Sequence, residues 1–247
     1  DFGVTWDNEY VSLQMLAPDY QPMVGYPLSH TRGTDGRRVA QAVIVELQVR
    51  GDLAKYRGRF DAGWDALRAA RFDRQRAMGL IEPNAQLPPR NPGVPAWDDL
   101  TAEQRALFAR YMECYAGLVD NADQNVGRLL AFLEHSGQLD NTLILITSDN
   151  GANSIGGPTG VMNLHDRRQG FAEDPAAVQR LLQTDRVGSD DTYAAYPSGW
   201  TQVSNTPYRY YKRTPMAGGI RVPFVAHWPR GVAERGALRP QWIHVTD

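Results

Sequence analysis

Apolar residues recur at helical spacing through one long segment in the middle of the chain. They are Leu107, Tyr111, Tyr115, Leu118, Val126, Leu129, Leu130 and Leu133. They form one stripe with a period of about 3.6 residues, which predicts a long amphipathic helix. Thr101 with Gln104 three residues later is a capping box, so the helix should begin there. Gly137 should end it.

Two short apolar runs predict buried strands, over residues 142–148 and 222–228. Uninterrupted apolar runs are typical of strands covered on both faces, as in a parallel or mixed sheet. Further helices are expected over 52–78, interrupted at Gly58 and Gly63 and stopped at Gly79, and over 175–183. The pattern therefore predicts an α/β fold with a mixed, mostly parallel sheet flanked by helices.

Glycine and proline break the remaining segments. Residues 1–46 show no dependable period, so we expect coil there, with at most a short strand near 39–45. Residues 82–99 hold five prolines and should form a loop. Most of 150–205 should also be loop, because it is rich in Gly, Asn, Asp and Ser.

Composition excludes several classes of protein. The 247 residues carry 26 basic and 28 acidic side chains, a net charge of -2, which does not favour nucleic-acid binding. No apolar stretch approaches the roughly 20 residues of a membrane span, and the single cysteine, Cys114, cannot form an internal disulfide. We expect a soluble cytoplasmic or periplasmic protein; composition leaves the compartment and the oligomeric state open.

Asp149 and Asn150 directly follow the first predicted strand. In an open α/β sheet, ligands bind beyond the carboxyl ends of the strands, where polar side chains converge. A carboxylate next to a carboxamide offers the oxygen ligands that Ca²⁺ or Mg²⁺ prefers. Asp-Asn-Gly is also a common turn sequence, so local chemistry alone leaves a plain turn as the alternative.

Several blocks in a fixed order resemble the sulfatase family of the alkaline phosphatase superfamily. They are YAGLVDNADQNVGR at 115–128, DNTLILITSDNGA at 140–152, NTPYRYYK at 205–212 and GGIRVP at 218–223. KYRGRFDAG at 55–63 resembles the bacterial arylsulfatase branch in particular. Such blocks together are far more specific than any one alone. The resemblance covers about residues 47–247.

This resemblance implies an alkaline phosphatase-like fold, incomplete here, and roles for particular residues. Asp149 and Asn150 would ligate a divalent cation, usually Ca²⁺, with Mg²⁺ as the alternative. Lys212 would contact the sulfate group of a small-molecule sulfate ester, because an ammonium can hold an anionic oxygen as charge develops. Without its flanking blocks, Lys212 would be interpreted as a solvated surface lysine. His165 could approach the site, although an exposed loop histidine is the commoner case.

Some features of the family have no counterpart in the sequence. Its nucleophile is a formylglycine made from Cys or Ser in a Cys/Ser-x-Pro/Ala-x-Arg motif, and no serine fits that motif. Cys114 has Leu118 where the arginine belongs, so we expect a buried structural cysteine. The family's paired aspartates, its Lys-x-His segment and its Pro-His segment before residue 55 are also missing. Residues 1–46 are therefore interpreted as a divergent or misframed segment, which resequencing codons 1–50 would test, and 47–247 as a partial catalytic domain.

The sequence thus predicts the C-terminal portion of an arylsulfatase-like sulfuric ester hydrolase. It would use a divalent cation and a formylglycine nucleophile lying outside this chain, which alone should be inactive. One alternative is a phosphodiesterase or phosphonate monoester hydrolase of the same superfamily. Another, from a different class, is a non-catalytic fragment that only folds or binds.

Overall fold

The computed structural model describes side chains for residues 52–189, 192–239, 241 and 243–244. Before these, it describes the backbone of four strands and of the start of helix α1. The strands are β1 (Val4–Asp7), β2 (Tyr10–Leu16), β3 (His30–Arg32) and β4 (Arg38–Ile44). They form an antiparallel sheet in the order β1-β2-β4-β3, with Leu13 opposite Ala42 in the register.

The strand expected near residues 39–45 is confirmed as β4, but the expectation of coil is wrong for β1, β2 and β3. Residues 11–15 alternate apolar and polar positions, a period-two pattern typical of a strand. In the sequence, Pro18 lies between β2 and β3 and Gly33 between β3 and β4, so neither falls within a strand.

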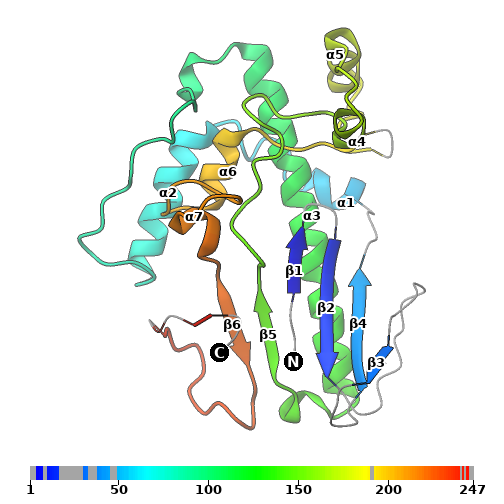
Figure 1. The fold of residues 1–247 in the computed structure, drawn as a ribbon, viewed down its shortest axis with the longest axis vertical. Coiled ribbons are helices and arrows are strands. Elements are labelled where there is room, and N and C mark those ends of the chain that lie inside the picture. Colours follow the sequence, from blue (N-terminus) through cyan, green and yellow to red (C-terminus); the bar gives the residue numbers. More distant parts are fainter. Residues whose placement is uncertain are drawn as a thin grey trace.

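A second sheet is made of β5 (Ile144–Thr147) and β6 (Phe224–His227), which pair antiparallel. Both fall within the two apolar runs predicted to be strands. The mostly parallel sheet is not confirmed, because every ladder between the described strands is antiparallel. Figure 1 shows β1 beside β5, and the two strands are in contact.

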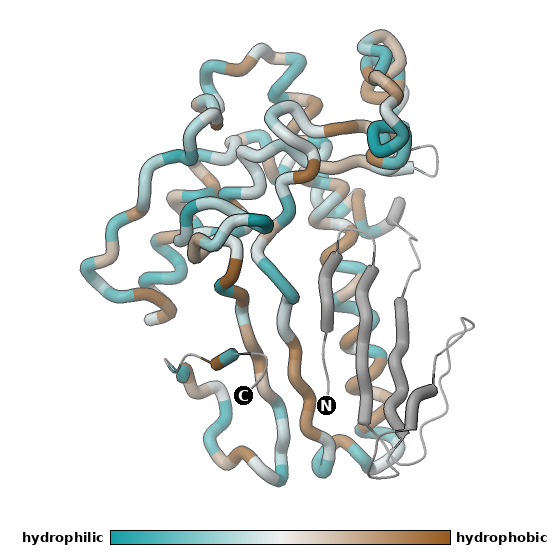
Figure 2. The backbone as a smooth tube through the Cα atoms, in the orientation of Figure 1, coloured by the Kyte–Doolittle hydropathy of each residue, from teal (hydrophilic) through white to brown (hydrophobic). Residues whose placement is uncertain are grey.

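The burial expected for the second strand is wrong, since all four residues of β6 are exposed. Phe224 is 44% and Val225 54% exposed, and His227 is exposed as well. Figure 2 shows apolar stretches along both β5 and β6. Apolar composition predicted the strand correctly, but burial also requires a second layer over it, and none of the described elements covers β6.

The predicted helices are found where expected. Helix α1 (Val49–Ala54) and helix α2 (Gly63–Ala77) flank the interrupted stretch around Gly58. Helix α3 (Ala102–His135) begins at the Thr101 capping box and runs along most of the molecule (Figure 1). Gly79 and Gly137 follow α2 and α3 with positive φ, as helix stops require. Short 3₁₀ turns lie at Trp97–Asp99 and Leu139–Asn141.

Four shorter helices lie after β5. They are α4 (Leu164–Arg168), α5 (Pro175–Gln183), α6 (Ser198–Ser204) and α7 (Ala217–Ile220). The sequence predicted only α5. Helix α6 is buried from Gly199 to Val203, so tertiary packing stabilises it although its sequence has little helical preference. Among the described helices, none is long and apolar enough to cross a membrane.

The core forms where α2, α3 and α6 meet the loop 91–100. Trp64 and Trp200 are completely buried, with ring centroids 5.8 Å apart. Trp97 packs against both rings. The indole N–H groups are satisfied by backbone carbonyls, Trp64 donating to Pro95 and Trp200 to Phe108. This aromatic cluster fixes α6 against α3, and α6 leads directly into residues 205–212.

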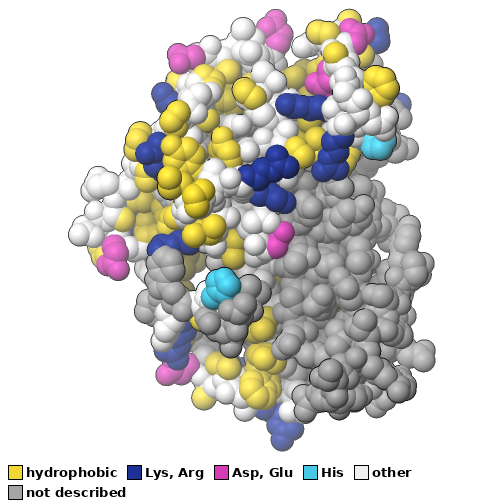
Figure 3. Space-filling view, viewed as in Figure 1, with side chains coloured by type: hydrophobic (Ala, Val, Ile, Leu, Met, Phe, Trp, Pro, Cys, Tyr) yellow, Lys and Arg dark blue, Asp and Glu magenta, His cyan; other side chains and the backbone are white. Residues whose placement is uncertain are grey.

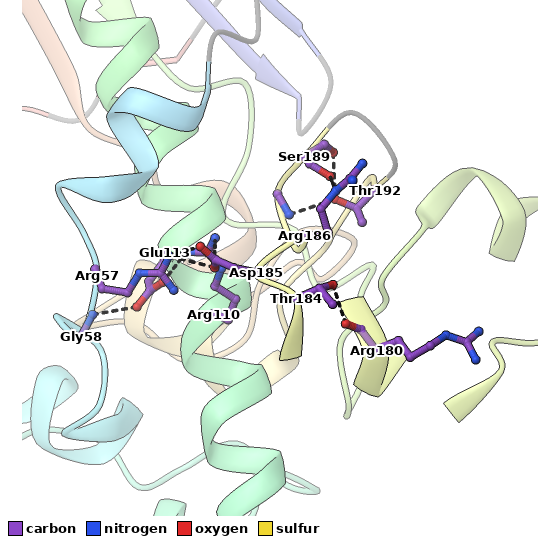
Figure 4. Close-up of polar contacts among 11 residues, drawn as sticks. Arg57, Gly58, Arg110, Glu113, Arg180, Thr184, Asp185, Arg186, Ser189 and Thr192 are labelled. Carbon is purple, nitrogen blue, oxygen red and sulfur yellow. Dashed lines mark hydrogen bonds and ion pairs between the residues drawn. The ribbon is translucent and has the colours of Figure 1, made fainter. Parts of the chain in front are cut away.

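An ion-pair network ties the block at residues 55–63 to α3 and to the turn after α5 (Figure 4). Arg57 donates two hydrogen bonds to Asp185, at 2.7 and 2.8 Å. Arg110, on α3, pairs with both Asp185 and Glu113. The second oxygen of Glu113 accepts the N–H of Gly58 at 2.8 Å. Arg110 and Glu113 are both buried, so their charges are stabilised by pairing with each other, and Arg110 is stabilised by Asp185 as well.

Candidate functional site

The chain turns sharply where β5 ends. Beyond Thr147 it passes through Asp149, which is exposed, and Asn150, which is half-buried. The Ser148 hydroxyl donates to the carbonyl of Asn150 at 2.8 Å and braces this turn. Both predicted cation ligands therefore lie at the carboxyl end of β5, where solvent and ligands can reach the carboxylate of Asp149.

The segment 205–219 lies directly against the turn. The N–H of Lys212 donates to the carbonyl of Ala152 at 3.0 Å, and the N–H of Gly151 donates to the carbonyl of Gly219 at 3.0 Å. Two backbone hydrogen bonds thus join segments that lie some 60 residues apart in sequence. The structure brings Lys212 next to the turn that carries Asp149 and Asn150.

Two glycines permit this close approach. A Cβ atom at Gly151 would lie 1.7 Å from the carbonyl oxygen of Gly218. A Cβ atom at Gly218 would lie 2.2 Å from the carbonyl oxygen of Tyr210. A side chain at Gly151 would push the turn away from Gly218, whereas one at Gly218 would clash with Tyr210 and distort the segment 205–219 itself.

The backbone around Lys212 is strained. Tyr210 and Arg213, on either side, have φ values of +63° and +73°. For a residue with a Cβ atom, this conformation costs about 1–2 kcal/mol. Such strain persists only where the surroundings fix the backbone. Here the N–H of Tyr210 donates to the Asn91 side chain at 3.2 Å.

The side chain of Asn205 connects the two segments, a role that sequence reasoning missed. Its Oδ1 accepts from the N–H of Ala152 at 2.8 Å, and its Nδ2 donates to the carbonyl of Tyr210 at 2.9 Å. The sequence showed only that Asn205 opens one of the family-like blocks. An asparagine directly after a helix is a weak signal for such a contact, because short amides commonly bind nearby backbone.

Figure 3 shows Lys and Arg side chains gathered near the centre of one face, above β5 and β6, with an acidic side chain close by. Lys212 itself is half-buried, and Arg213 is exposed. A surface of this charge attracts anionic ligands.

His165 lies on α4 and is exposed. Its ring Nε2 is 2.7 Å from the side-chain amide nitrogen of Gln169, the residue that caps the C-terminal end of α4. The helix is held by the Asn163 cap and by a bridge from Asn163 to Tyr193. The described contacts of His165 thus lie within α4 and its two capping residues, Asn163 and Gln169, and the expectation that it approaches the site stays a prediction.

The oxygen ligands at the turn suit Ca²⁺ or Mg²⁺ in kind but not in number. Asp149 offers one carboxylate and Asn150 one amide oxygen, whereas Ca²⁺ takes six to eight oxygen ligands. Over the described part of the chain, no three His, Cys, Asp or Glu side chains lie close enough together to hold a metal ion. By themselves, Asp149 and Asn150 could therefore supply only part of a cation's ligand shell.

Cys114 was expected to be a buried structural cysteine in the helix, and the structure confirms its place in α3 but not full burial. It is partly buried and packs at the edge of the aromatic core. Desolvation raises the pKa of its thiol to about 11. A thiol with such a pKa is almost entirely protonated at neutral pH and is a poor nucleophile.

Alkylation of Cys114 should therefore be slow and strongly pH-dependent. At pH 8 we expect iodoacetamide to react about 100-fold more slowly than with a free cysteine of pKa 9, since the thiolate fraction falls tenfold per pH unit below the pKa. The rate should keep rising up to about pH 11. Mass spectrometry of the alkylated chain measures this, and a rate that levels off near pH 8 would contradict it.

Comparison with known proteins shows the family. The profile described as Sulfatase matches residues 50–246. The chain therefore belongs to the sulfatase family, which implies an alkaline phosphatase-like α/β fold.

Individual relatives carry sulfatase names as well. An uncharacterized sulfatase of Schizosaccharomyces pombe is 34% identical over 178 residues, 72% of this chain and 31% of the relative. An arylsulfatase of Klebsiella aerogenes is 29% identical over 199 residues, 79% of this chain and 40% of the relative. An N-acetylglucosamine-6-O-sulfatase of Bacteroides thetaiotaomicron is 50% identical over 44 residues, 18% of this chain and 8% of the relative. The matched residues span less than half of each relative.

Proposed function

We propose that this chain supplies part of the active site of an arylsulfatase-like sulfuric ester hydrolase. Asp149 and Asn150 would contribute ligands to a divalent cation, Ca²⁺ or Mg²⁺. Lys212 would bind the sulfate group of a small-molecule ester. The formylglycine nucleophile would be supplied from outside these residues, since no cysteine or serine here fits its motif.

One observation carries this proposal: the hydrogen bond from the Lys212 N–H to the Ala152 carbonyl. The bond holds the backbone of Lys212 against Ala152, which lies two residues after Asn150 in the sequence. A cation ligand and an ammonium group can therefore face the same anionic group. Lysine is a flexible point charge with three donors, suited to an oxyanion whose charge grows during the reaction. Donors fixed in place before the reaction stabilise such charge without reorganising.

The cation would supply Lewis-acid polarisation of a sulfate oxygen when bound. In this chain, Asp149 would provide one negative charge toward it, and Asn150 a neutral oxygen. The Ser148 hydroxyl, by bonding to the carbonyl of Asn150, holds the turn in one conformation. The chain's own contribution is thus to position two ligands and one ammonium.

Metal affinity of the chain alone should be low. With one charged ligand present, we expect Ca²⁺ to bind with a Kd of about 1 mM or weaker. Calorimetry on the purified chain and on Asp149→Ala measures this. Micromolar binding that Asp149→Ala abolishes would mean that further residues complete the site and that the proposed division of the active site is wrong.

Catalysis by the chain alone should be absent. Charge stabilisation cannot replace the covalent step, and removing a nucleophile typically costs several orders of magnitude in rate. Release of nitrophenol from nitrophenyl sulfate by the wild-type chain should not exceed that of Lys212→Ala. Turnover above this control would show that these residues contain a nucleophile after all.

The experiment that tests the function uses a protein in which residues 47–247 are joined to a complete N-terminal half. A sulfate monoester carries one negative charge and a phosphate monoester nearly two, so one cation and one ammonium balance the sulfate better. We expect a higher kcat/KM for nitrophenyl sulfate than for the matched phosphate monoester and diester. Preference for either phosphate ester would favour the phosphodiesterase or phosphonate hydrolase alternative, and turnover of none would favour a non-catalytic role.

A further inference from the structure

We propose that Asn205 is a positioning residue that couples the cation-ligand turn to the lysine segment, an inference that rests on the proposed function for its catalytic consequence. Its side-chain amide would set the spacing between Asn150 and Lys212. Asn205 would touch neither cation nor sulfate.

The geometry of the amide supports this role. Ala152 presents an N–H, which requires an acceptor, and Tyr210 presents a carbonyl, which requires a donor. One planar carboxamide supplies both at a fixed separation. Ala152 lies two residues after Asn150, and Tyr210 lies two residues before Lys212. The Lys212 N–H to Ala152 carbonyl bond then closes the loop between the two segments.

The backbone of Asn205 is itself anchored to the hydrophobic core. Its N–H donates to the carbonyl of Thr201 at 3.1 Å, so it ends helix α6. Trp200, the residue before Thr201, is fully buried, and its indole N–H donates to the carbonyl of Phe108 on α3. Asn205 is only 9% exposed. A side chain fixed in this way can impose a position on the segments that it binds, rather than follow them.

The strained backbone of Tyr210 points in the same direction. Its positive φ requires surroundings that hold it. Asn205 binds the carbonyl of Tyr210, and Asn91 binds its N–H. Asn91 in turn donates its own N–H to the buried Gln202 side chain at 3.1 Å. Two buried amides therefore hold the residue from which the chain leads to Lys212.

This arrangement requires an amide side chain at position 205. Aspartate at position 205 could still accept from Ala152, but its second oxygen would face the carbonyl of Tyr210 and repel it. Alanine would lose both bonds. Asn205→Asp therefore removes only the bond to Tyr210, whereas Asn205→Ala removes the bonds to both Ala152 and Tyr210.

The test measures hydrogen exchange of individual backbone amides by NMR in the 247-residue chain. In Asn205→Ala, the amides of Ala152 and Lys212 should both lose about tenfold protection, the effect of losing one hydrogen bond each. Ala152 loses its bond to Asn205 directly, and Lys212 loses its bond because the two segments separate. In Asn205→Asp at neutral pH, Ala152 should keep its protection and Lys212 should lose it. Below the pKa of the new carboxyl, its O–H can donate to Tyr210, so protection of Lys212 should return.

Asn153→Ala is the matched control. Asn153 lies in the same loop, and its side chain accepts only a local bond, from the N–H of Ile155 at 3.1 Å. Its substitution should change exchange at Ile155 and leave Lys212 unaffected. Protection in α3 should stay constant in all three variants, which separates local uncoupling from general destabilisation. Unchanged protection of Lys212 in both Asn205 variants would overturn the inference, as would a loss spread evenly over the core.

The catalytic consequence is measured separately, in the protein with a complete N-terminal half. Asn205→Asp should lower kcat for nitrophenyl sulfate, and acidic pH should partly restore it. If exchange in the Asn205 variants changes as described but the wild-type protein hydrolyses no sulfate ester, the coupling stands and the proposed function is refuted. Exchange that does not change would refute the coupling, whatever the activity.

Discussion

Lys212→Ala is expected to lower kcat/KM for nitrophenyl sulfate by about 10²–10³-fold, the usual effect of removing one preorganised charge donor from a developing oxyanion. The protein for this measurement joins residues 47–247 to a complete N-terminal half. Lys212→Arg should recover little, because a planar fork on a longer side chain cannot take the place of a compact ammonium. Steady-state kinetics on the three proteins checks this.

The chain offers a matched control, since Lys55 is its one other lysine. Lys55 forms ion pairs with Asp52 and Asp120 at 2.9 and 3.1 Å, between α1 and α3, and its side chain is 51% exposed. Exposed pairs of this kind contribute about 0–1 kcal/mol, so Lys55→Ala should leave kcat/KM nearly unchanged. Equal losses in the two variants would remove the special role of Lys212.

Glu113→Ala should have the largest effect on stability. The change leaves the buried guanidinium of Arg110 without its closest partner and the N–H of Gly58 without an acceptor. Breaking a buried ion pair from one side costs about 3–5 kcal/mol. Because Asp185 still pairs with Arg110 at 3.1 Å, we expect about 3 kcal/mol, the lower end of that range, and a fall in Tm of roughly 10 °C for a chain of this size. Calorimetry or circular dichroism measures the change. Glu113→Gln keeps an acceptor for Gly58 and should fall between the wild type and Glu113→Ala.

Asp73→Ala is the control for this prediction. Asp73 pairs with Arg76 on the exposed side of α2, at the same three-residue spacing as Arg110 and Glu113. Its loss should change the free energy of unfolding by no more than about 0.5 kcal/mol. If Glu113→Ala were as mild as this control, the buried network would not be what fastens the 55–63 block to α3.

The local signals in the sequence were sufficient wherever a structure depends on neighbours in the chain. The Thr101 capping box and the stripe from Leu107 to Leu133 predicted α3, and the structure confirms both ends to within a residue or two. Gly79 and Gly137 predicted helix stops because positive φ is a property of a single residue. Cys114 could be classified from its helical position because burial governs the reactivity of a thiol.

Patterns that depend on partners elsewhere were less informative. The run at 222–228 predicted a strand but not that β6 is exposed, since a strand does not specify what covers it. Helix α6 carried no periodic signal, because its burial against Trp64 comes from tertiary packing. The strands β1–β3 were missed because the prolines and glycines along residues 1–46 were weighed as breaks in any element. Whether a short segment forms a strand also depends on partner strands elsewhere in the chain.

At the candidate site, the sequence by itself determined which residue types are present: a carboxylate and an amide after a strand, a lysine within a family-like block, and no nucleophile motif. The family followed from the order of those blocks. Only the tertiary structure decided that the N–H of Lys212 meets Ala152 and that Asn205 spans both segments. The physical reason is that these contacts join residues some 60 positions apart and require the α6 core and the missing side chain of Gly151, neither of which leaves a local pattern.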